Sequence, residues 1–430
     1  MDFESSSQAR FWMLNELTLS ECRAKAAVVQ PSTKKRARSF ACGYRDRINE
    51  NMGCSLEAKS RRMMPLDQET LVHFHAHQIQ RLIGPNAIFP ELQRSSSVLS
   101  TAIMLFRRFY LSNSIVDFHP RAMAAASALL AVKVDCEPFL EIDVLSHATS
   151  VISIKARSAR VCRDELKWVS VQEIEHAEMD LMKGLEYRLR CHHPYGAIKR
   201  LSEEMAEILR DTRPQETERY GYRSSWSNSS ELYKEELLET LCDRAIAVAQ
   251  SALVYSDVSF LYAPGKIAFA AVAIALEDFD HYSQLGPRMT EYLRMRFPHK
   301  KTTELSDFGS EVSRIIGAIS SAPGIDIKHF SIRPNSRHSM AMQMHAMELR
   351  RVFSLVARLR ECIKRDEAKQ KRHFAPCTVE PSPKRRRLSF CVPSGNEGKF
   401  YADPIEPARV TPVQTPAYSE ERMLYYSTFV

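Results

Sequence analysis

Two alanine-rich segments of the same design constrain the fold of this chain more than any other feature. PRAMAAASALLA at Pro120–Ala131 recurs 144 residues later as PGKIAFAAVAIA at Pro264–Ala275. Proline suits the first turn of a helix, because its missing N–H would have no partner there. Both segments are apolar on nearly every face, so other helices must surround them, and alanine lets those backbones approach closely. We therefore predict a duplicated helical unit, with chance recurrence of a buried helix as the alternative.

Composition points to an all-α protein of more than one domain. The chain has 430 residues, enough for two or three domains with sizeable cores, and only 13 glycines. Helix-forming residues dominate, and alternating β-branched runs are few. The ten cysteines form no CxxC pair, which argues against a disulfide framework or a zinc site and for a reducing compartment. The N-terminal sequence is unlike a signal peptide, and no apolar run approaches membrane-spanning length.

The positive charge of the chain is concentrated in three segments. The formal net charge is +8, with basic runs at Lys34–Arg38 and Lys384–Arg387. Residues 336–372 hold ten Lys and Arg against four Asp and Glu. Such segments can bind nucleic acid or anionic membranes, but they more often serve as localisation signals or solvated ends. We expect a nuclear protein without direct nucleic-acid binding, whose import cluster consists of Lys384, Arg385, Arg386 and Arg387.

Apolar residues at helical spacing predict five helices in the first copy. Asp67 is the expected N-cap of a helix whose buried stripe is Val72, Ala76, Ile79 and Ile83. The next helix has the stripe Val98, Ala102, Leu105 and Phe109. The helix at Pro120, a short helix at 139–150 and a helix at about 170–187 complete the set.

The second copy and the flanking segments follow from similar patterns. Helices are expected at 234–256, 264–280, 287–296 and 303–322, after an insert at 211–233 that is rich in Ser, Asn, Arg and Tyr. A long final helix has the stripe Leu349, Val352, Val356, Leu359 and Ile363. The predicted organisation is an N-terminal part over 1–64 (a helix at 8–29, then a polar insert), a first repeat over 65–190, a second over 191–330, a basic helix over 331–373 and a disordered proline-rich tail over 374–430.

Several motifs, taken together, resemble the cyclin family. They are RRFYLSNSIVDFHPR (Arg107–Arg121), LLAVKVD (Leu129–Asp135), EMDLMKGLEYRL (Glu178–Leu189), HHPY (His192–Tyr195) and YSDVSFLYAPGKIAFAAVAIA (Tyr255–Ala275). The set is similar to the cyclin box, and within that family to the H type, over roughly residues 5–29 and 66–370. This resemblance implies two five-helix repeats flanked by long terminal helices. It also implies no catalytic activity, and the task of holding a kinase's C helix in its active orientation.

The resemblance also implies which residues meet the kinase. Lys133 and Glu178 match the cyclin pair that contacts the catalytic subunit, and Phe139 is either an apolar anchor for it or a core residue. The alternative interpretation is an ordinary surface lysine and glutamate. The implied partners are a cyclin-dependent kinase, a RING-type assembly factor and the core of general transcription factor IIH. The implied outputs are phosphorylation of other such kinases and of the RNA polymerase II C-terminal repeat.

Other patterns weigh against competing functions. No Gly-rich phosphate loop, HRD or DFG motif is present, and no catalytic constellation, metal site or cofactor is expected. His73 and His77 are four residues apart, but with no third ligand they indicate a solvated or hydrogen-bonded pair. The first box helix, LVHFHAHQIQRLI, lacks the MRxxLxxW pattern of cyclins that recruit substrates through a hydrophobic patch. That kind of substrate docking is therefore not expected.

The C-terminal tail contains three Ser/Thr-Pro pairs. Ser382, Thr411 and Thr415 each precede proline and are expected phosphorylation sites. Phosphate at Ser382 would add about −1.5 to −2 charge beside the basic cluster.

The alternatives to the H type are a transcriptional cyclin of the C, T or L type, and a promoter-binding factor built from two cyclin-like repeats. Promoter-binding factors of that kind usually begin with a zinc ribbon, for which the chain has no CxxC pair.

Overall fold

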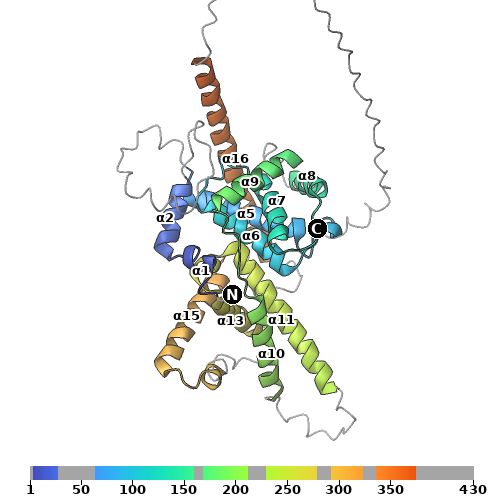
Figure 1. Ribbon diagram of the computed structural model, residues 1–430, viewed down its shortest axis with the longest axis vertical. Coiled ribbons are helices and arrows are strands. Elements are labelled where there is room, and N and C mark those ends of the chain that lie inside the picture. The colour runs from blue at the N-terminus through green and yellow to red at the C-terminus, as the bar shows by residue number, and fades with distance from the viewer. Residues whose placement is uncertain are drawn as a thin grey trace, which may run out of the picture. The chain divides into compact units, whose positions relative to one another are not determined.

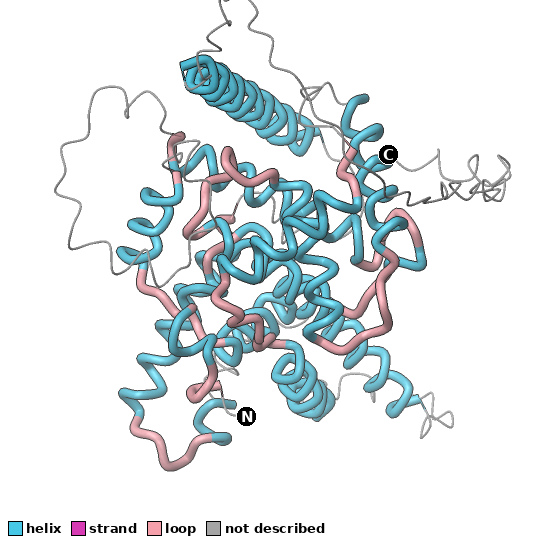
Figure 2. Tube along the Cα trace, turned by 45° about the horizontal axis from the view of Figure 1, so that its top comes forward, coloured by secondary structure: helices cyan, strands magenta, loops and turns pink. Residues whose placement is uncertain are grey.

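The computed structural model describes residues 3–27, 63–158, 168–211, 229–277, 292–322 and 336–373. The chain divides into two units, Met1–Phe374 and Ala375–Val430, and all the described residues belong to the first. These residues fold into helices joined by loops, without a strand among them, as the all-α prediction requires (Figure 2). Within the same residues, no helix is both long and apolar enough to cross a bilayer.

The first repeat contains the five predicted helices (Figure 1). They are α5 (Pro65–Ile83), α6 (Ser96–Tyr110), α7 (Pro120–Val134), α8 (Ile142–Ser158) and α9 (Val171–Gly184), with a 3-10 turn, η3 (Pro90–Leu92), between the first two. Helix α7 packs against all four other helices, and 13 of its 15 residues are buried. Its alanines keep the surrounding backbones close, which explains why an almost uniformly apolar helix is stable here.

The second repeat is built around the second alanine-rich helix. Its helices are α10 (Tyr195–Asp211), α11 (Ser229–Tyr255), α12 (Val258–Leu261), α13 (Pro264–Glu277) and α15 (Thr302–Ser320), and residues 292–296 are also helical. Helix α13 packs against α10, α11 and α15, at the centre of a hydrophobic core of its own. The recurrence of the alanine-rich segment therefore does mark two central helices.

The N-terminal prediction of one helix over 8–29 is wrong. The segment forms two helices, α1 (Ser7–Phe11) and α2 (Glu16–Ala26). The chain turns between them because Trp12 is buried in the core and the Leu14 amide donates to the Phe260 carbonyl. Asn15 then starts α2 as an N-cap, its Oδ1 accepting from the Thr18 amide at 2.7 Å.

Several predicted boundaries differ from the structure. The short helix expected at 139–150 is the longer α8, which begins at Ile142 and continues to Ser158. Helix α5 begins at Pro65 with Met64 as its N-cap residue, so Asp67 is not a cap. Asp67 is instead buried in the first turn, where its Oδ1 accepts from Arg351 at 2.5 Å. The expected insert at 211–233 is too long, because α10 continues to Asp211 and α11 begins at Ser229. The insert proper, like the polar insert before residue 63 and the start of the 287–296 helix, lies outside the described residues.

The final helix, α16 (Ser336–His373), docks on the first repeat by the predicted stripe. Leu349, Val352, Val356, Leu359 and Ile363 are all buried in the first core. Phe353 adds an edge-to-face contact with Phe74 of α5, with ring centroids 5.3 Å apart. These contacts hold one face of α16 on the repeat and leave charged faces exposed.

Candidate partner-binding site

Lys133 and Glu178 form an ion pair on the surface of the first repeat. The Lys133 Nζ lies 2.6 Å from the Glu178 Oε1, and the two residues come from the last turn of α7 and the middle of α9. The side chain of Lys133 is 47% exposed and that of Glu178 is 12% exposed. The pair is therefore open to a partner on the lysine side while Glu178 is held against the protein.

Local sequence explains why these two residues meet at the surface. Helix α7 emerges from the core only in its last turn, where a lysine also interacts favourably with the helix dipole. Helix α9 begins with a capping box between Ser170 and Glu173, which fixes where its first turn starts. Ile174, Ala177 and Leu181 are buried on one face of α9, so Glu178 lies at the edge of that face.

Large apolar side chains on α9 and in the loops next to α7 and α9 are exposed. Phe139, in the loop between α7 and α8, is 73% exposed, which excludes its interpretation as a core residue. Three more were missed from the sequence: Trp168, Met179 and Tyr187. Met179 falls off the buried stripe of α9, which was a usable signal. Trp168 and Tyr187 are in loops, where spacing gives no such signal.

A partly buried ionic network joins the N-terminal segment to both repeats. Asp257 accepts from Arg23 of α2 at 2.5 and 2.8 Å and from Arg107 of α6 at 3.0 Å, and Arg23 also pairs with Glu69 of α5 at 2.7 Å. Burial alone would raise the pKa of Asp257, but the hydrogen bond from Arg23 and the positive charges of Arg107 and Arg23 outweigh it and lower that pKa. Asp257 is therefore ionised in the folded protein and compensates the positive charges of Arg23 and Arg107.

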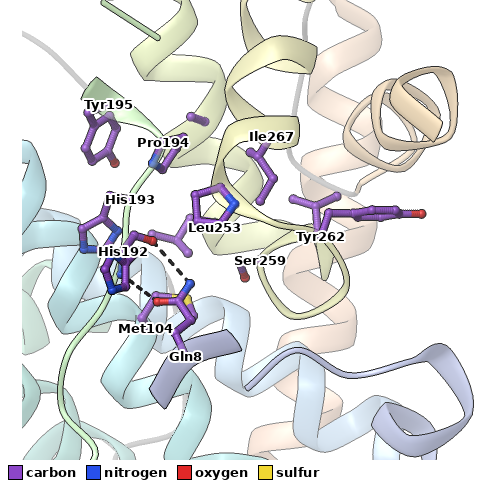
Figure 3. Close-up of a pocket in the computed structure, with 13 residues that line it drawn as sticks. Gln8, Met104, His192, His193, Pro194, Tyr195, Leu253, Ser259, Tyr262 and Ile267 are labelled. Atoms are coloured by element: carbon purple, nitrogen blue, oxygen red, sulfur yellow. Dashed lines mark hydrogen bonds between the residues drawn. The ribbon is translucent and has the colours of Figure 1, made fainter. Parts of the chain in front are cut away.

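A pocket of about 400 Å³, part of it open to solvent, lies where α1 and the second repeat meet the inter-repeat linker, the segment between α9 and α10 (Figure 3). Gln8 hydrogen bonds to the backbone of His192, accepting from its N–H at 2.7 Å and donating to its carbonyl at 3.3 Å. Burial lowers the pKa of His193 to about 4 and raises that of Tyr195 to about 12, so both are neutral at physiological pH. The lining holds no carboxylate or thiol.

Comparisons with known proteins show which proteins the chain is similar to. No protein-family model matches the chain. Cyclin CCL1 of Saccharomyces cerevisiae is 24% identical over 310 residues, which cover 71% of this chain and 63% of CCL1. Cyclin-H1-1 of Arabidopsis thaliana is 25% identical over 295 residues, covering 65% of this chain and 74% of that protein. The chain is related to the H-type cyclins.

A solved structure shares the fold of this cyclin relative. A chain of the CAK complex from Chaetomium thermophilum, bound to ATP-γ-S, superposes with a TM-score of 0.50. The superposition covers 89% of this chain and 98% of the other, at 16% sequence identity. At that identity the likeness concerns the fold alone, and the roles of individual residues have to be argued from their own geometry.

The remaining predicted sites are accounted for as follows. His73 and His77 are half-buried and face the ring of Tyr255, with centroids 6.4 and 6.1 Å away, and the His77 Nδ1 is 3.0 Å from Gln80 Oε1. The described residues contain no group of three side chains that could hold a metal ion. The phosphorylation sites Ser382, Thr411 and Thr415 and the cluster Lys384, Arg385, Arg386 and Arg387 lie outside the described residues.

Proposed function

We propose that this chain is a regulatory cyclin that binds and activates a cyclin-dependent serine/threonine kinase and performs no chemistry itself. The observation that carries the proposal is the Lys133–Glu178 pair at the surface of the first repeat, where the lysine is half-exposed, the glutamate is largely covered and the neighbouring Met179 is exposed. An ammonium group can donate to free carbonyls at the end of a partner helix, and a carboxylate can accept from free N–H groups. The pair therefore suits the backbone of a mobile helix.

Burial of the exposed apolar side chains at this surface could supply the binding free energy that activation requires. Kinase chemistry requires the lysine of strand β3 and the glutamate of the C helix to pair around the ATP phosphates. Converting a 1:99 mixture of active and inactive orientations to 99:1 takes about 5.5 kcal/mol of differential binding. Burying one large apolar side chain contributes about 1.5–3 kcal/mol. Two or three of Phe139, Trp168, Met179 and Tyr187 would suffice if they are covered only in the active complex.

Among the described residues, the second repeat has no counterpart of the Lys133–Glu178 site. The 144-residue spacing that relates the two alanine-rich helices sets Glu277 opposite Lys133, a reversal of charge. The second repeat does have an ion pair between its central and last helices, Lys266 to Glu311 at 2.6 Å, but Lys266 is at the start of α13 rather than its end. These differences support one kinase per chain, bound at the first repeat.

The relatives suggest the type of complex. Because the similar proteins include an H-type cyclin and the shared fold is that of a chain from a CAK complex, we assign the partner to the CDK-activating class. The complete proposal includes a RING-type assembly factor, the core of general transcription factor IIH, a nuclear location, and roles in RNA polymerase II transcription and the cell cycle. Transcriptional cyclins of the C, T or L type and a promoter-binding factor are the rivals.

Purification of the complex from nuclei tests the type. The full chain, tagged and expressed in its own cells, is isolated and its partners are identified by mass spectrometry. We expect a cyclin-dependent kinase together with helicase subunits. A mediator or elongation kinase would instead indicate one of the rival cyclin types, and recovery of promoter DNA without any kinase would refute activation altogether.

Mutation of the ion pair tests the site. Lys133→Ala with Glu178→Ala should weaken activation of the recovered kinase by about 10- to 100-fold, as loss of central contacts usually does. The matched control is Lys266→Ala with Glu311→Ala, which removes an ion pair of the same length from the second repeat. Unchanged activation by the first double variant, with helical content preserved, would show that the contact lies elsewhere.

A further inference from the structure

The loop from Asp135 to Glu141, which presents Phe139, is fastened to the protein at two points. At its start, Asp135 Oδ2 accepts from Thr101 Oγ1 at 2.9 Å and from Ser97 Oγ at 3.5 Å, both from α6. Near its middle, the carbonyls of Pro138 and Phe139 accept from Arg94 Nη2 at 3.5 and 3.3 Å. Every one of these side-chain donors comes from residues 94–101, and a backbone hydrogen bond from the Glu137 N–H to the Val132 carbonyl at 3.1 Å adds to them.

Thr101 also contacts the inter-repeat linker. Thr101 Oγ1 is also 2.9 Å from His193 Nε2. A hydroxyl has one proton and an ionised carboxylate can only accept, so Thr101 donates to Asp135 and accepts from the Nε2–H of His193. This assignment requires a neutral histidine protonated on Nε2. The start of the loop is therefore tied to α6 and to the inter-repeat linker at once.

The backbone of the loop is strained at one residue, so other contacts must hold it in this conformation. Cys136 has φ 55°, in the left-handed region where a non-glycine residue is strained. Leu140 is fully buried, and Phe139 beside it is 73% exposed. The loop thus has a fixed backbone and an outward ring. A group ordered before binding loses less conformational entropy when its partner arrives.

We propose that Arg94 and Thr101 are positioning residues for kinase binding, which hold the loop so that Phe139 is already in its binding conformation. The inference rests on the proposed function and goes beyond it, because Thr101 is buried and the Arg94 side chain is largely covered, so both would act through the loop. Arg94 also donates to the carbonyls of Glu91 and Gln93 at 2.8 and 2.7 Å, which fixes its own guanidinium at the base of the loop.

A double-mutant cycle distinguishes positioning from general stabilisation. Binding of the co-purified kinase is measured by interferometry for Arg94→Ala, Phe139→Ala and the double variant of the full chain. We expect each single variant to lose about 10-fold in affinity and the double variant to lose little more, because Arg94 acts through Phe139. Losses that multiply, or a Phe139→Ala variant that binds like wild type, would overturn the inference. Arg365→Ala, in an exposed pair with Glu361 on α16, is the matched control.

A second measurement needs no kinase, so its failure is distinguishable from a failure of the proposed function. Hydrogen exchange of residues 135–141 is followed in the free full chain. Arg94→Ala and Thr101→Val should speed exchange there by at least about 10-fold, while Thr101→Ser, which keeps the hydroxyl, should restore protection. Exchange equal to wild type in both variants would overturn the inference even if the kinase binds. If Arg94→Ala fails to fold, the Thr101 pair of variants decides the question alone.

Discussion

His193 makes the stability of this protein depend on pH in a way that can be isolated. Burial, together with the positive charges of Arg108 and His192, lowers the pKa of His193 to about 4. In the unfolded chain a histidine titrates near 6.5. The folded state therefore keeps His193 neutral over a range of pH in which the unfolded state binds a proton.

The sign and size of the effect follow from linkage. Since the folded pKa is the lower one, the contribution is fully present above pH 6.5 and is lost as the pH falls toward 4. Relative to pH 7, the loss is about 2 kcal/mol at pH 5 and about 3 kcal/mol at pH 4. Losses of this size are a substantial part of a typical domain stability of about 5–15 kcal/mol.

Urea unfolding of wild type and His193→Gln at several pH values measures the effect. Glutamine keeps an N–H donor for Thr101 but cannot be protonated, so all other titrating groups cancel in the difference between the two proteins. Between pH 7 and pH 5, we expect the free energy of unfolding of wild type to fall by about 2 kcal/mol more than that of His193→Gln. Parallel pH profiles of the two proteins, or an imidazole NMR titration of His193 near 6.5, would refute the reasoning.

Two further substitutions test the packing that supports the site. Gly184→Ala would set a Cβ 2.6 Å from the ring of buried Phe109, so we expect about 1–3 kcal/mol of destabilisation and a lower thermal midpoint by calorimetry, and no change in midpoint would contradict this contact. Asp257→Asn removes the charge that compensates Arg107 and Arg23, and should cost about 3–5 kcal/mol in denaturant titrations, with faster proteolysis of the N-terminal segment. An Asp257→Asn protein as stable and as resistant as wild type would refute the network's importance.

The parts of the fold that the sequence predicts well are those governed by a repeating spacing. The central helices at Pro120 and Pro264, and the buried stripe of α16, each follow from residues whose environment depends on their own helix. Trp12 shows where this reasoning stops. It lies in a run of helix-forming residues, but burying its ring against the core required the chain to turn, and no local pattern reveals that core.

The candidate site is harder to predict, because its members meet only through tertiary packing. Lys133 and Glu178 lie on different helices, and family resemblance alone singled them out. Phe139 could not be assigned to the core or to the surface until its exposure was known. The contacts of Thr101 with Asp135 and His193 join three separate parts of the chain, so periodicity contains no trace of them. Asp67 was misread as a cap because its true partner, Arg351, is far away in sequence.

The ion pair between Arg23 and Asp257 has a consequence for biosynthesis. The two residues are 234 positions apart, so α2 leaves the ribosome long before its acceptor exists. At about 5–20 residues per second, the wait is roughly 12–47 seconds. During that time Arg23 has Glu69 of α5 as its ionic partner, while its second partner, Asp257, has not yet been made. The ionic link between the N-terminal segment and the second repeat can therefore form only after residue 257 has been synthesised.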